Sequence, residues 1–179
     1  MTTMIDTRLA SADDVDVLLA DVTAGFASYV DFLPSGWRPP DVSHERGRTA
    51  ELIADDATWA SIALVDGEPA GHAAFFPARR RTPGAPADDW PGRDVIPGVA
   101  HLWQLFVLPE WWGRGVAPVL HDAAIAAMRS RGYARTRLFT PSLHARARTF
   151  YERRGWSAAD GEWNEFLDLR LVEYRLELS

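Results

Sequence analysis

The segment PEWWGRGVAPVL, residues Pro109–Leu120, combines residue types that suit a phosphate group. Two indoles precede a Gly-Arg-Gly-Val-Ala run, and helix-forming residues follow at once. Glycine has no Cβ, so a ligand can approach the backbone closely there. A helix that begins at this point also directs unpaired amides and the positive end of its dipole outward. The pattern predicts either an anion site built from backbone or a tight turn without a ligand.

Other kinds of reactive site find little support in the sequence. The chain has no cysteine, which excludes a cysteine acyl-enzyme and thiolate metal sites. It has no lysine, so a Walker-type phosphate loop is also excluded. The five histidines are scattered without metal-ligand spacing, at His44, His72, His101, His121 and His144. We therefore predict no metal.

The composition suits a single globular domain over residues 1–179. The chain is 47% hydrophobic, which is enough for a core without disulfides. Its N-terminus lacks a basic start followed by an apolar run, and no stretch approaches the roughly 20 apolar residues that span a bilayer. We expect a cytoplasmic protein with no membrane partner. The net charge of −6 argues against a nucleic-acid partner.

The first half of the chain predicts a strand, two helices and a hairpin. A strand is expected at Ile5–Leu9, and Ser11 is a candidate N-cap for a helix with apolar residues at helical spacing. A mostly polar helix is expected over residues 43–55. Two strand-like runs then flank Asp66-Gly67, a dipeptide that favours a two-residue hairpin turn.

The second half predicts alternating strands and helices. Residues 77–98 are rich in proline, glycine and charge and predict a long loop. The apolar run VAHLWQLFVL predicts a central strand, which leads into the glycine segment and a helix ending at Gly132. A strand at TRLFT and a helix from Pro141-Ser142 to Gly155 follow. The alternating tail 171–178 predicts a half-exposed strand at the end of a sheet.

Two motifs in the second half of the chain, the glycine segment and a second segment ending at Trp156, together resemble the GNAT superfamily of acyl-CoA-dependent N-acetyltransferases. The first family signature is Arg or Gln, two residues, Gly, one residue, Gly or Ala, and here Gly115 and Ala117 match it. The second ends in Phe-Tyr-Glu-x-x-Gly-aromatic, which matches the run from Phe150 to Trp156. The resemblance implies an α/β fold of one domain. Its central, mostly antiparallel sheet would have about six to seven strands, flanked by about four helices.

The resemblance also implies acetyl-CoA as co-substrate. Its diphosphate would bind the backbone of five residues in the turn, namely Gly113, Arg114, Gly115, Val116 and Ala117. A backbone amide near Val107 or Leu108 would polarise the thioester carbonyl. Three features depart from the family pattern. Trp112 replaces the usual Arg or Gln, Pro118 offers no amide, and His144 stands where Asn commonly contacts the cofactor.

The resemblance assigns Tyr151 as the general acid, because a phenol stays protonated at neutral pH and can return a proton to the thiolate. His101 lies eleven residues before Trp112, where some members have a catalytic Glu, and is the candidate base. His72 on the preceding strand, or a water, is the alternative. For each of these residues, packing in the core is the competing interpretation.

We expect an enzyme that acetylates a primary amine of a small molecule or a peptide. The alternatives are an acyl-CoA-binding module without turnover, or transfer of another acyl group or to a hydroxyl. Departures at Trp112 and His144 would suit the binding module, whereas Tyr151 and His101 favour the enzyme. The oligomeric state stays open between a monomer and a homodimer.

Overall fold

The structure is a computed structural model that describes residues 4–80 and 93–178. The strands form a seven-stranded sheet in the order β1-β2-β3-β4-β5-β7-β6. Of the strand pairs with a defined register, β4–β5 is parallel and the others are antiparallel. With four α-helices among these residues, this confirms the predicted fold class. The chain falls into two compact units. The first unit is Met1–Phe76 with Leu102–Ala127, and the second unit is Pro77–His101 with Met128–Ser179.

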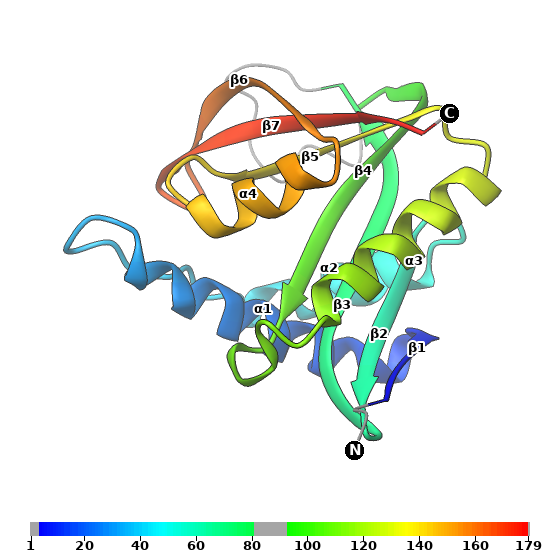
Figure 1. Cartoon of the computed structure of the whole chain (residues 1–179), viewed down its shortest axis with the longest axis horizontal. Helices are drawn as coiled ribbons and strands as arrows, with labels where there is room; N and C mark the ends of the chain where they lie inside the picture. The colour runs from blue at the N-terminus through cyan, green and yellow to red at the C-terminus, as the bar shows by residue number, and fades with distance from the viewer. Residues whose placement is uncertain (1–3, 81–92, 179) are drawn as a thin grey trace. The chain divides into compact units, whose positions relative to one another are not determined.

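The first unit begins with the sheet edge and the predicted hairpin (Figure 1). Strand β1 (Ile5–Leu9) pairs with β2 (Trp59–Val65), which pairs in turn with β3 (Glu68–Arg79). The turn between β2 and β3 is Asp66-Gly67, and both residues have positive φ, 52° and 90°. That geometry matches the twist of the two strands, so the dipeptide forms the hairpin as predicted.

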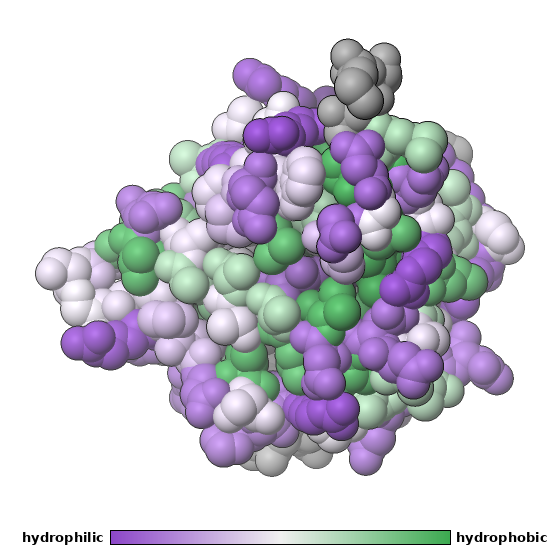
Figure 2. Space-filling model, turned by 90° about the horizontal axis from the view of Figure 1, so that it is seen from below, coloured by the Kyte–Doolittle hydropathy of each residue, from purple (hydrophilic) through white to green (hydrophobic). Residues whose placement is uncertain are grey.

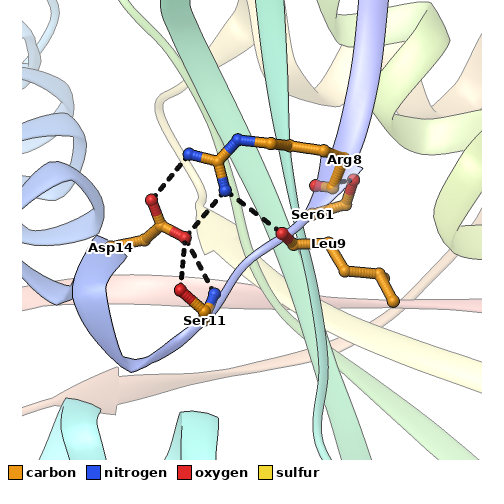
Figure 3. Close-up of polar contacts among 5 residues, drawn as sticks. All are labelled: Arg8, Leu9, Ser11, Asp14 and Ser61. Atoms are coloured by element: carbon orange, nitrogen blue, oxygen red, sulfur yellow. Dashed lines mark hydrogen bonds and ion pairs between the residues drawn. The ribbon is translucent and has the colours of Figure 1, made fainter.

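A charged contact fixes the entry into helix α1 (Val15–Ala27) (Figure 3). The guanidinium of Arg8 donates two hydrogen bonds to the carboxylate of Asp14, at 2.7 and 2.8 Å. The backbone amide of Ser11 donates to the same carboxylate. These donors hold the pKa of Asp14 well below its usual value, with the Arg8 bonds as the largest cause. Ser11 is the N-cap of the short 3₁₀ turn that precedes α1, as the sequence predicts.

Helix α1 packs one buried stripe against the sheet of the first unit. The stripe is Val15, Leu18, Asp21, Val22 and Gly25, at helical spacing. A Cβ on Gly25 would lie only 2.1 Å from the Phe106 ring. Only glycine therefore lets the helix lie this close to the strand. Helix α2 (Arg46–Ala54) is short, and an ion pair between Arg46 and Asp16 links it to α1.

The second unit corrects one prediction about the C-terminal strand. Strand β7 (Leu169–Glu177) lies between β5 (Arg135–Pro141) and β6 (Ser157–Asn164), so β6 and not the final strand is the edge. The alternation of the tail persists because β7 exposes Arg170 and Arg175 and buries Tyr174. Sequence alternation reports which side chains are covered, and it does not tell how many neighbours a strand has.

The boundaries of two other segments also differ from the prediction. The loop expected over residues 77–98 is shorter, because β3 continues to Arg79 and β4 (Val95–Val107) begins earlier. The Arg80 amide donates to the Asp94 carbonyl at 2.8 Å, which extends the pairing of these strands. Residues 81–92 of the predicted loop lie outside the described residues. Helix α4 (Ala145–Arg153) begins later than expected, because Pro141 is still in β5 and pairs with Leu171.

The two predicted helix ends are confirmed. Gly132 (φ 80°) and Gly155 (φ 84°) adopt the left-handed conformation that terminates helices. The surface shown in Figure 2 mixes hydrophobic and hydrophilic side chains. Within residues 4–80 and 93–178, no helix combines the length and the apolar character that crossing a bilayer requires.

Candidate functional site

The segment between β4 and α3 has the geometry that its glycines predict. The chain leaves β4 at Val107, makes a short 3₁₀ turn over Pro109–Trp111 and enters α3 (Val116–Ser130) (Figure 1). Gly113 (φ 73°) and Gly115 (φ 89°) both adopt the left-handed conformation, which other residues enter at a cost. We call residues 108–117 the glycine turn. These two glycines contribute no side chain just before the helix begins.

The two tryptophans hold the glycine turn in place. The indole nitrogen of Trp112 donates a hydrogen bond of 2.7 Å to the Val107 carbonyl, at the last residue of β4. The Arg114 guanidinium lies over the Trp111 ring, 5.3 Å from its centroid. Both indoles are half-buried. Trp112 therefore clamps the strand end to the turn, whereas the family pattern places a polar side chain there.

Backbone amides supply the donors that the glycine turn can offer. The first amides of α3, at Val116 and Ala117, have no carbonyl one turn earlier in the helix to pair with. Proline 118 contributes none. The Leu108 amide donates to the Ala70 carbonyl at 2.9 Å, so of the two amides predicted to polarise a thioester, this one already has an acceptor.

His101 and His72 have different surroundings, although both were considered as a base. His101 is half-buried in β4, its ring lies 5.6 Å from that of Phe139, and its backbone position pairs with Arg137 of β5. His72 has no exposed surface. Its Nδ1 lies 2.8 Å from Asp21 Oδ2, and its Nε2 lies 2.8 Å from Gln104 Oε1. His72 thus lies in the interior, with side chains of two other elements within hydrogen-bond distance of its ring nitrogens.

His144 and Tyr151 belong to the same short helix in the second unit. His144 is the N-cap of α4, and burial together with the nearby Arg146 charge lowers its pKa to about 4. Its imidazole is therefore neutral at physiological pH and can donate one hydrogen bond. Tyr151 is 8% exposed and packs against the rings of Phe150, Trp156 and Tyr174. The predicted site residues thus fall into two groups, the glycine turn in the first unit and the α4 residues with His101 in the second.

The structure contains two polar networks that were not predicted from the sequence. One is Asp21–His72–Gln104, in which an acidic residue lies on the buried stripe of α1. That signal was present in the sequence, because Asp21 follows Leu18 and precedes Val22 and Gly25 at helical spacing. The other network lies beside α4, where the Tyr174 hydroxyl donates to Glu152 at 2.6 Å and accepts from Arg148. No short-range pattern links Tyr174 to that helix.

A protein-family model supplies the observation that decides the family. The model described as the acetyltransferase (GNAT) family matches residues 24–156, which is more than half of the chain. The chain belongs to the GNAT family of acetyltransferases. The matched range includes the glycine turn, His101 and the Phe150–Trp156 motif. The predicted family and the predicted class of enzyme, an acyltransferase, are therefore confirmed.

Solved structures of the same fold cover almost all of this GNAT acetyltransferase. An N-acetyltransferase from Thermoplasma acidophilum in complex with coenzyme A is 15% identical, with a TM-score of 0.71 over 97% of this chain and 99% of that one. An N-acetyltransferase from Staphylococcus aureus is 16% identical, with a TM-score of 0.70 over 98% and 99%. No curated protein sequence matches the chain.

The ribosomal-protein-S18-alanine N-acetyltransferase of Escherichia coli is 16% identical, with a TM-score of 0.64 over 98% of this chain and 95% of that one. At these identities the likenesses establish the fold. Among the residues that the structure describes, no group of three or more His, Asp or Glu side chains could hold a metal ion.

Proposed function

We propose that this GNAT acetyltransferase transfers an acetyl group from acetyl-CoA to a primary amine of a small molecule or a peptide. The observation that supports this most is the glycine turn. Gly113 and Gly115 have positive φ, and α3 begins immediately after them with unpaired amides. Such a helix start favours a diphosphate. Coenzyme A is bound by the structurally similar Thermoplasma protein. An enzyme named for acetylating a ribosomal-protein alanine has the same fold, so peptidic amines belong among the acceptors to test.

The reaction is a direct attack within a ternary complex. The amine nitrogen forms a bond to the thioester carbonyl carbon, and the carbon–sulfur bond breaks to release the CoA thiolate. Tyr151 gives its phenol proton to that thiolate, and its burial among aromatic rings suits an uncharged acid. The proton lost by the amine passes to His101 or to a water. Since both ring nitrogens of His72 are engaged in the interior, His101 is the better histidine for this role.

The donor site is tested first by binding and by thiol release. Acetyl-CoA should raise the melting temperature, and a library of primary amines should release free CoA thiol in its presence. A binding module without turnover would show the thermal shift but no thiol release with any amine. Absence of both effects would overturn the proposed use of acetyl-CoA.

The candidate base is tested through the pH dependence of the rate. His101→Ala should lower the rate most at neutral pH, and the loss should shrink at alkaline pH because more of the amine is then deprotonated without help. Rate profiles of the parent and the variant between about pH 6 and 10 measure this, with a melting curve at each pH. An unchanged profile with a lower melting temperature would show that His101 only packs against Phe139.

A further inference from the structure

Helix α4 carries the proposed general acid but buries little of its own surface. It has nine residues, and Tyr151 is the one among them that is buried. The other eight are half-buried or exposed. A helix this short depends on tertiary contacts for most of its stability. The position of Tyr151 therefore depends on the few contacts that attach α4 to the strands of the second unit.

Tyr174 of β7 makes one of these contacts from a rigid place in the sheet. Strand β7 has a neighbour on each side, and position 174 pairs with Leu138 of β5 and Ala158 of β6. The Tyr174 side chain has no exposed surface. Its ring centroid lies 6.1 Å from that of Tyr151. A closely packed side chain on an internal strand has little freedom to move, so it can serve as a fixed point for the helix.

The Tyr174 hydroxyl binds α4 on both sides. It donates a hydrogen bond of 2.6 Å to Glu152 Oε1 and accepts one of 3.0 Å from Arg148 Nε. Hydrogen bonds to charged groups are stronger than those between neutral groups. Arg148, Tyr151 and Glu152 share one helix face, because they stand three and four residues apart. Arg148 also donates from Nη1 to the Ser142 carbonyl in the connection before α4. The hydroxyl thus fixes the rotation of this face toward β7.

We propose that the Tyr174 hydroxyl, through Glu152 and Arg148, positions the Tyr151 phenol for proton transfer to the departing thiolate. This inference rests on the proposed function. Both partners of the hydroxyl lie on α4, so Tyr174 acts through Tyr151 and is a positioning residue. Burial, together with the bond to Glu152, raises the pKa of Tyr174. The proton that it donates to Glu152 therefore stays in place at neutral pH.

Tyr174→Phe tests the proposal, because it removes the hydroxyl and keeps the ring beside Tyr151. We expect kcat to fall by about 10-fold, since a misplaced donor loses part of a general acid's roughly 10²–10⁴-fold contribution. The affinity for acetyl-CoA, measured by calorimetry, should change little, because proton donation matters only as the transition state forms. A variant that keeps the parent kcat overturns the inference.

Val172→Ala is the matched control for stability. Val172 is buried two residues away on the same face of β7, and its truncation leaves the hydroxyl network complete. It should lower the melting temperature at least as much as Tyr174→Phe does, yet keep the parent kcat. An equal loss of kcat in the two variants would place the effect in the stability of the core and would overturn the inference.

A double-mutant cycle tests whether Tyr174 acts through Tyr151. In a Tyr151→Phe background, Tyr174→Phe should cause no further loss of kcat, because the phenol that it positions is already absent. The same fold-loss in both backgrounds would mean that Tyr174 acts independently, and it would overturn the inference. Glu152→Gln keeps an acceptor oxygen for the hydroxyl, so it should retain more of the parent kcat than Glu152→Ala does. Equal values in these two variants would also contradict the proposed route.

Hydrogen exchange measures the attachment of α4 without reference to turnover. The Tyr151 and Glu152 amides should exchange about 3- to 10-fold faster in Tyr174→Phe than in the parent, because the helix opens more readily once the hydrogen bonds are lost. Unchanged exchange overturns the inference.

Failure of the proposed function gives a different result. If the parent transfers acetyl to no amine, or if Tyr151→Phe is as fast as the parent, the proposed function fails at that point and this inference fails with it. A slow Tyr151→Phe variant beside a Tyr174→Phe variant with the parent kcat overturns the inference alone.

Discussion

Two connections that lead from a strand into a helix, β4 to α3 and β5 to α4, are built in opposite ways. The glycine turn has two residues of positive φ and presents backbone amides. The second connection runs over Ser142–His144, where no residue has positive φ, and it caps α4 with the His144 residue. One connection exposes the backbone and the other positions side chains. Exposed amides favour a phosphate, so the first connection supports the proposed acetyl-CoA site, and the second leads into the helix that carries Tyr151.

The largest effect that this comparison predicts concerns Tyr151, on the helix that the second connection enters. Tyr151→Phe should lower kcat by roughly 10²- to 10⁴-fold, because it removes the proton donor for the thiolate. The affinity for acetyl-CoA should change little. Steady-state kinetics on the best amine, with calorimetry of acetyl-CoA binding, measure the two quantities.

Tyr133→Phe is the matched control, since it removes a phenol hydroxyl from the segment between α3 and β5. It should leave kcat unchanged. Equal rates for the Tyr151 variant and the parent at several pH values would remove Tyr151 from the mechanism.

Acetyl-CoA binding at the glycine turn should be sensitive to the addition of a single methyl group. Gly115→Ala places a Cβ on a residue with φ 89°, which strains the turn and crowds the approach of a phosphate. Acetyl-CoA affinity should fall by about 10-fold or more. Gly132→Ala imposes the same strain at the other end of α3, where φ is 80°. Calorimetry should show weaker binding in the first variant only, and equal losses in both would place the effect in the stability of α3.

Loss of the Trp112 hydrogen bond should have a smaller effect on acetyl-CoA binding. Trp112→Phe removes the hydrogen bond to the Val107 carbonyl but keeps an aromatic ring in the corner. We expect acetyl-CoA affinity to fall by about 3- to 10-fold, because the turn is held less firmly. Trp163→Phe, at an indole that is 59% exposed on β6, should have no effect. A Trp112 variant that binds as tightly as the parent would show that the glycines alone orient the amides.

The smallest predicted effect is a pH dependence of the protein's folding stability that arises from His144, in the connection between β5 and α4. Burial lowers the pKa of His144 to about 4, so the unfolded chain binds more protons than the folded one between that pH and about 6.5. Stability therefore rises with pH across this window. His144→Gln should flatten that rise by on the order of 1 kcal/mol, measured by urea unfolding at several pH values.

The sequence predicted the backbone connection better than the side-chain connection, for a physical reason. A turn with positive φ requires glycine, so Gly113 and Gly115 reveal its geometry directly. Pro141 suits a strand end as well as a first helical turn, and its pairing with Leu171 decides between them. That partner lies thirty residues away, where local patterns do not reach.

The same limit applies to the candidate site. Tyr151 and the glycine turn were identified because they stand in motifs. The Asp21–His72–Gln104 network joins three elements and became visible only through their packing. The edge position of β6 was missed for a similar reason, since sheet order depends on pairing between distant segments.

Gly25 couples two positions that lie far apart in the sequence. The Phe106 ring occupies the space where a side chain at position 25 would begin. A larger residue at 25 would therefore require a smaller one at 106, or α1 would have to move away from the sheet. Among sequences that diverge from this chain, a larger residue at position 25 should therefore occur together with a smaller residue at position 106.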